Sequence, residues 1–382
     1  MSARRPWAWP LVPAYRAAAA LDAVLYRLGA LRTRRLRWPV VSIGSVSAGG
    51  AGKTPVVIAL AALLREHGWH VDVLSRGYGR SGREVEKVPA GADAGRFGDE
   101  PTLIAERTGL PVWVGPDRFT AGQCAEGETL PQRPSGSRRI WRDRTARTMR
   151  SGYKPAQFPE EPVLVHLLDD GFQHKALVRD FDIVLITAED LDDVLLPAGN
   201  LREPLVALRR ADALVMREEE REDVEARVRE IVGCSVPLWS IRRSLRFPQP
   251  LGVFSAGLRP VAFCGLARPE GFAAMLAEAG CGVVETVAFH DHHVYTLADA
   301  EHILKIARNL NATGLLTTEK DAVKLTPELR KVLSALGPLA TVALDADFVF
   351  KAPVIRALEA RLHPPARPRT EAASNAGEAR LR

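Results

Sequence analysis

The chain has 382 residues, of which 46% are hydrophobic, 26% charged and 6% aromatic, so it can bury a sizeable core and is no disordered, collagen-like or coiled-coil protein. Four cysteines without C-x-x-C spacing indicate neither a zinc ribbon nor a disulfide framework. The net charge of +6 is concentrated in residues 1–37 and 131–154, which each hold eight basic residues and one aspartate. The remainder is acidic, as in many cytosolic enzymes, and a nucleic-acid partner is not indicated.

The first 37 residues predict an amphipathic helix. No uncharged stretch approaches the roughly 20 residues that a bilayer-spanning helix needs. On a helical wheel Arg16 and Arg27 lie opposite an apolar side formed by Ala14, Ala18, Leu21, Leu25 and Leu28. Such a side can face a protein core or a lipid interface. Early aromatic residues and a closing basic run favour the interface, namely Trp7, Trp9, Tyr15, Arg32, Arg34, Arg35 and Arg37.

The next part of the chain alternates short apolar runs with helical stretches. Residues 40–43 predict a buried strand, followed by a glycine-rich turn, a helix over 55–66 and a second strand over 71–75. Further β-branched runs occupy residues 112–114, 163–168, 183–187 and 213–216. This alternation predicts an α/β fold, a doubly wound parallel sheet with ligands at the carboxyl ends of its strands.

A change of pattern near residues 240–247, followed by Pro248 and Pro250, indicates a domain boundary. Beyond it a second, smaller α/β domain is predicted, with strands at 261–264, 283–289, 315–317 and 341–344 and helices at 269–279 and 297–310. The predicted organisation is therefore a membrane-associating segment (1–37), a nucleotide-binding domain (38–247), a smaller domain (248–362) and a disordered tail (363–382).

Residues 120–161 do not fit this alternation. They are rich in Gly, Pro, Arg and Ser and lack apolar periodicity, although a helix is expected before the strand at residue 163. The segment is predicted to be either a disordered insertion or a damaged helix.

The turn after the first strand carries a phosphate-binding motif. Its residues match G-x-x-x-x-G-K-[ST] except at the first position, and they are Ser47, Ala48, Gly49, Gly50, Ala51, Gly52, Lys53 and Thr54. With a strand before it and a helix after it, the loop can hold nucleotide phosphates on backbone N–H groups, with Lys53 on the terminal phosphates. Thr54 would hold Mg²⁺, so the fold is predicted to be of the P-loop NTPase type.

Two acids follow the apolar run at residues 163–168. Asp169 and Asp170 lie at the carboxyl end of a buried strand, where a P-loop protein needs a carboxylate for the metal ion. Asp169 is predicted to lie nearest the magnesium, with Asp170 adjacent. At this stage the residues define a Mg-nucleotide triphosphatase or kinase.

Six motifs, which follow one another along the chain in a fixed order, narrow the class of Mg-nucleotide triphosphatases and kinases. They are the Gly-Gly-x-Gly-Lys-Thr-Pro loop, Ser75 to Gly79 (SRGYG), Gly98 to Pro101 (GDEP), Asp169 to His174 (DDGFQH), Asn200 to Pro204 (NLREP) and Thr317 to Lys324 (TTEKDAVK). Over about residues 10–360 the chain resembles the tetraacyldisaccharide 4'-kinase family, the lipid A 4'-kinases. The resemblance implies transfer of the γ-phosphate of ATP to the 4'-hydroxyl of tetraacyldisaccharide 1-phosphate, a membrane-resident lipid, at the cytoplasmic face of the inner membrane.

The resemblance also implies roles for particular residues. Asp99 matches the aspartate thought to be the catalytic base, placed here in a loop after a strand or as a helix cap, and His292 would pair with it across the cleft. Whether His292 or His293 faces inward stays open. Candidates for substrate or pocket contacts are Arg76, Tyr78, Glu100, Gln173, His174, Arg202 and Glu203. Glu319, Lys320 and Asp321 would bind the nucleotide or lock the second domain.

A competing interpretation is a nucleotide-dependent switch or metallochaperone-type GTPase that acts on a protein partner. The chain has no N-K-x-D guanine motif and no Cys- or His-rich metal tract, so no protein partner is indicated. A third interpretation, a nucleic-acid ATPase, would require aromatic residues among the arginines, and residues 131–154 contain only Trp141 and Tyr153.

Overall fold

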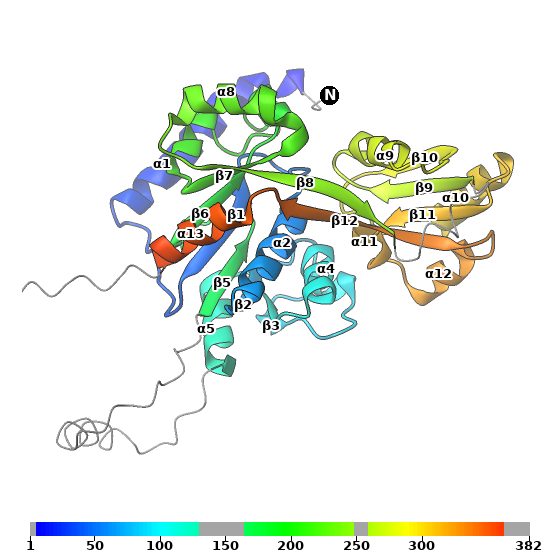
Figure 1. The fold of residues 1–382 in the computed structure, drawn as a ribbon, viewed down its shortest axis with the longest axis horizontal. Helices are drawn as coiled ribbons and strands as arrows, with labels where there is room; N and C mark the ends of the chain where they lie inside the picture. The colour runs from blue at the N-terminus through cyan, green and yellow to red at the C-terminus, as the bar shows by residue number, and fades with distance from the viewer. Residues whose placement is uncertain (1–4, 130–163, 248–258, 363–382) are drawn as a thin grey trace, which may run out of the picture.

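The computed structural model describes residues 5–129, 164–247 and 259–362. Within these ranges twelve strands form one sheet in the order β10-β9-β11-β12-β8-β7-β6-β1-β5-β2-β4-β3 (Figure 1). Strands β2, β5, β1, β6, β7 and β8 run parallel to one another, and the predicted α/β doubly wound fold is confirmed. The tail and residues 130–163, including most of the second basic stretch, lie outside the described residues.

The strand boundaries agree closely with the sequence pattern. In chain order the strands are β1 (Val40–Ser45), β2 (His70–Ser75), β3 (Glu86–Lys87), β4 (Val112–Val114), β5 (Leu164–Asp169), β6 (Phe181–Leu185), β7 (Ala213–Arg217), β8 (Leu238–Arg246), β9 (Pro260–Gly265), β10 (Glu285–Phe289), β11 (Gly314–Thr318) and β12 (Leu339–Phe348). The central strands β1, β5 and β6 are almost wholly buried, as their continuous β-branched runs predict.

Helices cover both faces of this sheet. The helices are η1 (Pro6–Leu11), α1 (Val12–Arg27), α2 (Lys53–Glu66), α3 (Ala94–Phe97), α4 (Asp99–Thr108), α5 (Arg118–Thr129), α7 (Ala188–Leu191), η2 (Leu205–Arg210), η3 (Glu218–Glu220), α8 (Arg221–Val232), α9 (Pro269–Glu278), α10 (Leu297–Asn309), α11 (Glu319–Ala322), α12 (Pro327–Leu333) and α13 (Lys351–Leu362). The apolar faces of α2 and α4 meet the sheet in the largest core cluster.

Two long antiparallel strands, β8 and β12, join the nucleotide-binding part to the smaller α/β part (Figure 1). A separate core lies between β9, β11, α10 and α12, built around Phe263, Ile303 and Leu333. Helix α13 belongs by sequence to the predicted smaller domain, yet Val354 and Leu358 pack in the nucleotide-binding core. The chain therefore returns to the first domain at its end, and the boundary at residue 248 stays a prediction.

Of the two alternatives for residues 120–161, the disordered insertion is wrong for the first part of the segment. Helix α5 extends from Arg118 to Thr129, and Ala121 and Ala125 pack in a core cluster with Leu36. Gly122 has no room for a side chain against this cluster, because a Cβ there would lie 2.2 Å from Leu36 Cδ1. The buried face consists of small residues, so large apolar residues do not mark it in the sequence.

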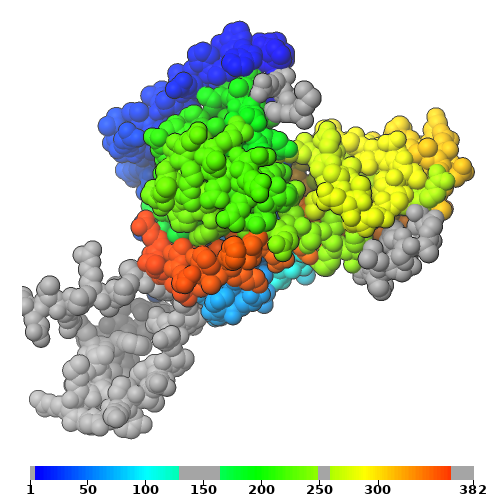
Figure 2. All heavy atoms as spheres, turned by 45° about the horizontal axis from the view of Figure 1, so that its top comes forward, coloured from blue at the N-terminus to red at the C-terminus, as the bar shows by residue number. Residues whose placement is uncertain are grey.

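Helix α1 lies on the outside of the nucleotide-binding part, as Figure 2 shows in dark blue. Its predicted apolar side does not enter the core: Leu21 is 59% exposed and Leu28 75%, and Trp7 in η1 is 75% exposed. Of the closing basic run, Arg34 pairs with Asp117 and Arg35 with Asp180. Among the described residues no helix combines the length and apolarity required to cross a bilayer.

Candidate active site

The loop between β1 and α2 has the shape of a phosphate cradle. Gly49, Gly50 and Gly52 have φ angles of +76°, +70° and +81°, a left-handed conformation that glycine adopts without steric cost. Helix α2 begins at Lys53 directly after the loop, so the free N–H groups of its first turn face the space above the loop. Backbone N–H groups and the positive end of a helix together form an anion site.

Lys53 links this cradle to the two acids at the end of β5. Its Nζ lies 3.3 Å from Ser45 Oγ and 3.4 Å from Asp170 Oδ1. Asp170 has a φ of +50°, which places it in the sharp turn after the strand. Asp169 is the last residue of β5, and its Oδ2 accepts a 3.0 Å hydrogen bond from Ser75. Asp169 Oδ1 is buried with no donor among the described residues, so it is free to ligate a cation.

The charges around these acids fit a magnesium ion. Burial raises the pKa of Asp169 to about 7, so a cation beside it would stabilise its ionised form. Burial also acts on Asp170, but Lys53 and Arg202 hold its pKa below the usual range. Within the described ranges no group of three or more His, Cys, Asp or Glu side chains could hold a metal ion. Thr54, buried in the first turn of α2, is the third protein candidate.

Arg202 closes the cradle on one side. Its Nη1 donates to Asp170 Oδ2 at 2.7 Å and to Gln173 Oε1 at 3.3 Å, while its backbone N–H donates to the Val46 carbonyl at 2.7 Å. Gln173 Nε2 in turn donates to the Ser45 carbonyl at 3.0 Å. The predicted site residues Arg202 and Gln173 thus hold the phosphate loop and the acid-bearing turn in one arrangement.

Asp99 is the first residue of helix α4, and the prediction of a loop after a strand or a cap at this position is wrong. A short helix, α3, precedes it, and Gly98 with a φ of +97° occupies the cap position. Asp99 Oδ1 accepts a hydrogen bond from the Glu100 N–H at 2.9 Å. The carboxylate is 6% exposed and lies at the positive end of the α4 dipole, which favours its ionised form.

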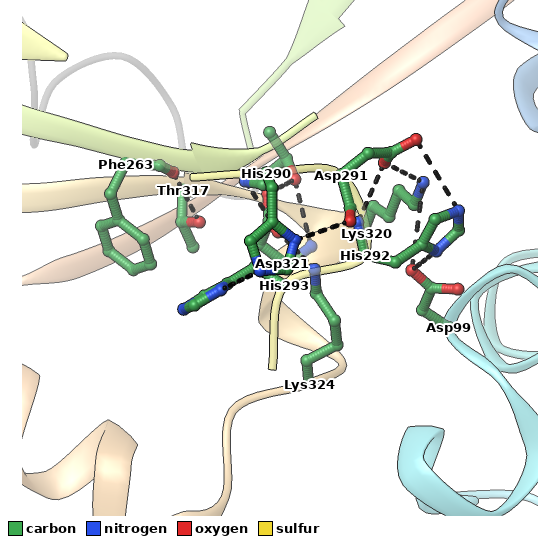
Figure 3. A network of polar contacts seen from close by, with 12 residues as sticks. Asp99, Phe263, His290, Asp291, His292, His293, Thr317, Lys320, Asp321 and Lys324 are labelled. Carbon is green, nitrogen blue, oxygen red and sulfur yellow. Dashed lines mark hydrogen bonds and ion pairs between the residues drawn. The ribbon is translucent and has the colours of Figure 1, made fainter. Parts of the chain in front are cut away.

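Side chains of the smaller domain reach Asp99 across the cleft (Figure 3). His292 Nδ1 lies 2.8 Å from Asp99 Oδ2, the pairing that the family resemblance implies. Lys320, from α11, has its Nζ 3.0 Å from Asp291 Oδ1, 3.6 Å from Glu100 Oε1 and 3.9 Å from Asp99 Oδ2. His292 has a φ of +58°, a conformation that a side chain rarely adopts away from functional turns. One lysine therefore lies within 4 Å of three carboxylates, two on α4 and one in the smaller domain.

These contacts set the protonation states of the pair. Burial acts to raise the pKa of Asp99, but the His292 hydrogen bond and the Lys320 charge outweigh it and hold that pKa below the usual range. The hydrogen bond to Asp99 raises the pKa of His292 against the effect of burial. Asp99 is therefore an ionised, weak base, and the basicity of the pair resides on the imidazole.

His293 does not face this site. Its Nε2 lies 3.0 Å from Asp299 Oδ2 and its Nδ1 3.0 Å from His290 Nε2, so its contacts stay within the smaller domain. The choice between the two adjacent histidines, which the sequence left open, falls to His292.

Three other residues that the sequence predicted for the site make no hydrogen bond or ion pair with its central groups in the described structure. Glu203 is buried but pairs with Arg210 rather than with the phosphate loop. Tyr78 is 66% exposed, with its ring centroid 5.1 Å from that of His292. Arg76 is exposed at the end of β2.

Two cations at the site were not predicted. Arg268, from the smaller domain, crosses to the phosphate loop, where a Cβ on Gly50 would lie 2.8 Å from its Nε, and it pairs with Glu189 and Asp190. Arg118, the first residue of α5, is 6% exposed. Neither belongs to a recognised motif, so no sequence signal distinguishes them from surface arginines.

A P-loop between a parallel sheet and a second domain, with metal-binding acids and a carboxylate–imidazole pair beside it, defines a phosphotransferase of the P-loop class. The switch interpretation offers no role for that pair. A family model described as tetraacyldisaccharide-1-P 4'-kinase matches residues 4–363, and the chain belongs to this family.

Individual relatives agree with the family assignment. The tetraacyldisaccharide 4'-kinase of Koribacter versatilis is 36% identical over 351 residues, covering 88% of this chain and 95% of the relative. That of Anaeromyxobacter dehalogenans strain 2CP-1 is 37% identical over 90% of this chain and 86% of its own. The crystal structure of LpxK from Aquifex aeolicus in complex with ATP superposes with a TM-score of 0.66 at 28% identity, covering 93% of this chain and 98% of that one.

Proposed function

We propose that this protein transfers the γ-phosphate of ATP to the 4'-hydroxyl of tetraacyldisaccharide 1-phosphate. The observation that supports this most directly is the Asp99–His292 pair, contributed by two domains and placed beside the phosphate loop, where Asp291 Oδ2 comes within 3.5 Å of the Cβ position of Gly49. An alcohol acceptor must lose a proton as it is phosphorylated, and such a pair can take it. A nucleotide switch has no alcohol to deprotonate.

Different residues serve different parts of the phosphoryl transfer. The loop N–H groups and Lys53 hold the terminal phosphates, and Arg202 keeps the acid-bearing turn in place. Asp169, Asp170 and Thr54 are suited to hold a Mg²⁺ ion, which would neutralise negative charge on the nucleotide phosphates. We assign acceptance of the hydroxyl proton to the Asp99–His292 pair, whose carboxylate and imidazole are coupled through the 2.8 Å contact between Oδ2 and Nδ1.

The test is transfer of labelled γ-phosphate from Mg-ATP to detergent-solubilised tetraacyldisaccharide 1-phosphate. Wild type should phosphorylate the lipid, and His292→Gln should lose on the order of a hundredfold or more in kcat. His293→Gln, which removes the adjacent imidazole that faces Asp299, is the matched control and should keep near wild-type kcat. Nucleotide hydrolysis by wild type without any lipid product would favour the switch interpretation instead.

We further propose that η1 and α1 dock the enzyme on the membrane that holds this lipid, at its cytoplasmic face. The exposed apolar residues on this segment include Trp7, Trp9, Leu11, Leu21 and Leu28, and these suit the boundary between headgroups and acyl chains. Leu21→Ser with Leu28→Ser should reduce sedimentation with anionic vesicles about tenfold. Val206→Ser, at an exposed apolar residue on η2, should leave it unchanged. Equal binding by both variants would contradict the docking role.

A further inference from the structure

Polar contacts join helix α1 to two turns of the active site. None of the residues of this helix is buried. Tyr15 Oη donates a hydrogen bond to the Arg202 carbonyl at 2.9 Å. Asp22 Oδ2 accepts one from Lys175 Nζ at 2.8 Å, in the turn that follows the metal-binding acids. The segment with the exposed apolar residues therefore also contacts the turns that carry site residues.

The turn that carries Arg202 is paired with the phosphate loop. The Arg202 N–H donates to the Val46 carbonyl at 2.7 Å. The Ala48 N–H donates in the other direction, to the Asn200 carbonyl at 2.8 Å. This is the antiparallel pattern of two short strands, and a bridge of that type joins the two segments. A shift of the turn is therefore passed directly to the backbone that would hold the nucleotide phosphates.

The N-terminal segment holds this turn at two points. The Arg5 N–H donates to the Ala198 carbonyl at 2.7 Å, and the Arg5 Nη1 donates to the carbonyls on either side of that residue at 3.2 Å. Tyr15 holds the backbone of Arg202 itself. Burial raises the pKa of Tyr15, which the charge of Arg202 only partly offsets, so the hydroxyl is protonated at pH 7 and remains a donor.

The ion pair of Asp22 acts on the second turn. Its partner, Lys175, lies two residues after Gln173, whose Nε2 donates to the Ser45 carbonyl at the end of β1. Gln173 Oε1 accepts from Arg202, so the two turns also contact each other. A partly exposed ion pair contributes little by itself, and we expect Tyr15 to have the larger effect.

The polar contacts and the exposed leucines lie on different faces of α1. Tyr15 and Asp22 are seven positions apart, which is about two helical turns, so they share one face. Leu21 and Leu28 have the same spacing and lie about 120° further round the helix axis. One rigid helix thus presents one face to the catalytic turns and another to the surroundings, and a displacement of the second face moves the first.

We propose that Tyr15 and Asp22 are positioning residues, which hold the turns of Arg202 and Gln173 in the arrangement that phosphoryl transfer requires. This inference rests on the proposed function, both the transfer and the docking of α1 on the membrane. When the apolar face of α1 enters lipid, its polar face fixes the turn beside the phosphate loop. Removal of the polar contacts should therefore slow the transfer by an enzyme that still binds the membrane.

The decisive experiment measures turnover and membrane binding on the same variants, in mixed phosphatidylcholine and phosphatidylglycerol vesicles that contain tetraacyldisaccharide 1-phosphate. Tyr15→Phe removes only the hydroxyl, so kcat for the transfer of labelled phosphate should fall roughly twofold to tenfold. The KM for ATP and sedimentation with the vesicles should stay unchanged. Wild-type kcat in Tyr15→Phe, or a loss of vesicle binding that accounts for its lower kcat, would overturn the positioning role.

The matched control is Tyr26→Phe. It makes the same chemical change on the same helix, at a hydroxyl without a hydrogen-bond partner among the described residues, and it should behave as wild type. Asp22 is tested by exchange of charges. Asp22→Lys and Lys175→Asp should each lower kcat about twofold, because like charges then face each other, and the double variant should restore it. A double variant without recovery would overturn the role of Asp22.

Amide hydrogen exchange provides a readout that does not depend on phosphoryl transfer. Over residues 197–203, vesicle-bound Tyr15→Phe should exchange on the order of threefold faster than vesicle-bound wild type. Equal exchange in the two proteins would overturn the coupling between α1 and this turn. If wild type transfers no phosphate yet the two proteins differ in exchange, the proposed function fails and the coupling stands.

Discussion

The two halves of this active site are held in different ways. In the nucleotide-binding half, the phosphate loop, the acids after β5 and Arg202 are joined by short hydrogen bonds to buried strands and to one another. The smaller domain contributes Asp291 and His292 from a tight turn and Lys320 from a four-residue helix, and these reach Asp99 only across the cleft. The first half can therefore exist by itself, whereas the second exists only while the domains keep their relative placement.

Removing the lysine of the first half should have the largest effect. Lys53→Ala takes away the cation on the transferred phosphate and the partner of Asp170, so kcat should fall on the order of a thousandfold or more, with no change in its pH dependence. The measurement is lipid phosphorylation under saturating conditions. A loss below tenfold would show that the loop N–H groups suffice without Lys53.

The pair across the cleft should come next, and it should change the pH profile. A raised pKa on His292 means that its neutral, proton-accepting form is lost on acidification at a higher pH than for an ordinary imidazole. Asp99→Asn removes the cause of the shift. The acid limb of kcat should move to lower pH, with a loss on the order of a hundredfold at its plateau. An unmoved limb would return proton acceptance to another group.

The contacts that place the two domains should matter less. Arg107, near the end of α4, pairs with Glu319 and Asp345 of the smaller part, so Arg107→Gln loosens the helix that begins with Asp99. We expect kcat to fall roughly threefold to tenfold with an unchanged KM for ATP. Arg243→Gln, which breaks a similar pair with Glu219 within one domain, is the control. Equal effects of the two variants would mean that domain placement does not depend on Arg107.

The smallest effect on activity is expected at a buried cluster of the first half. His166 lies between Asp72 and Glu126 and stacks on Trp38, and although burial opposes it these acids raise the pKa of His166 to about 9. A pKa raised on folding stabilises the protein below the unfolded value near 6.5, and this contribution is lost as pH rises through about 9. The melting temperature of wild type should therefore fall between pH 6.5 and 9 more than that of His166→Gln. Parallel curves would show that His166 is not charged in the native state.

Much of the first half could be predicted from sequence, because its residues lie in or beside continuous motifs. The glycine loop, Lys53 and the two aspartates each follow a recognisable strand, and local spacing fixes where such residues meet. The pairing of Asp99 with His292 joins residues 193 positions apart, and no periodicity predicts it. Only the family resemblance suggested that contact.

The predictions failed where small or isolated residues carry the structure. Helix α5 buries Ala121 and Ala125 rather than leucines, so its apolar face does not stand out from a polar loop. Arg118 and Arg268 are single arginines outside any motif, and their importance depends on burial and on strands that meet far from them in sequence. The sequence predicted Asp99 directly after a strand, whereas a short helix, α3, separates it from the preceding strand.

The connection between the two parts is a two-stranded ribbon, with Ile241 to Arg246 of β8 paired antiparallel to Ala343 to Phe348 of β12. A paired ribbon resists shearing, since sliding would break its ladder of hydrogen bonds, but it can twist about its long axis. The smaller part should thus rotate about the long axis of the ribbon, which moves His292 and Lys320 towards or away from Asp99. The torsional stiffness of the ribbon, set by residues far from any phosphate, would then govern how often His292 contacts Asp99.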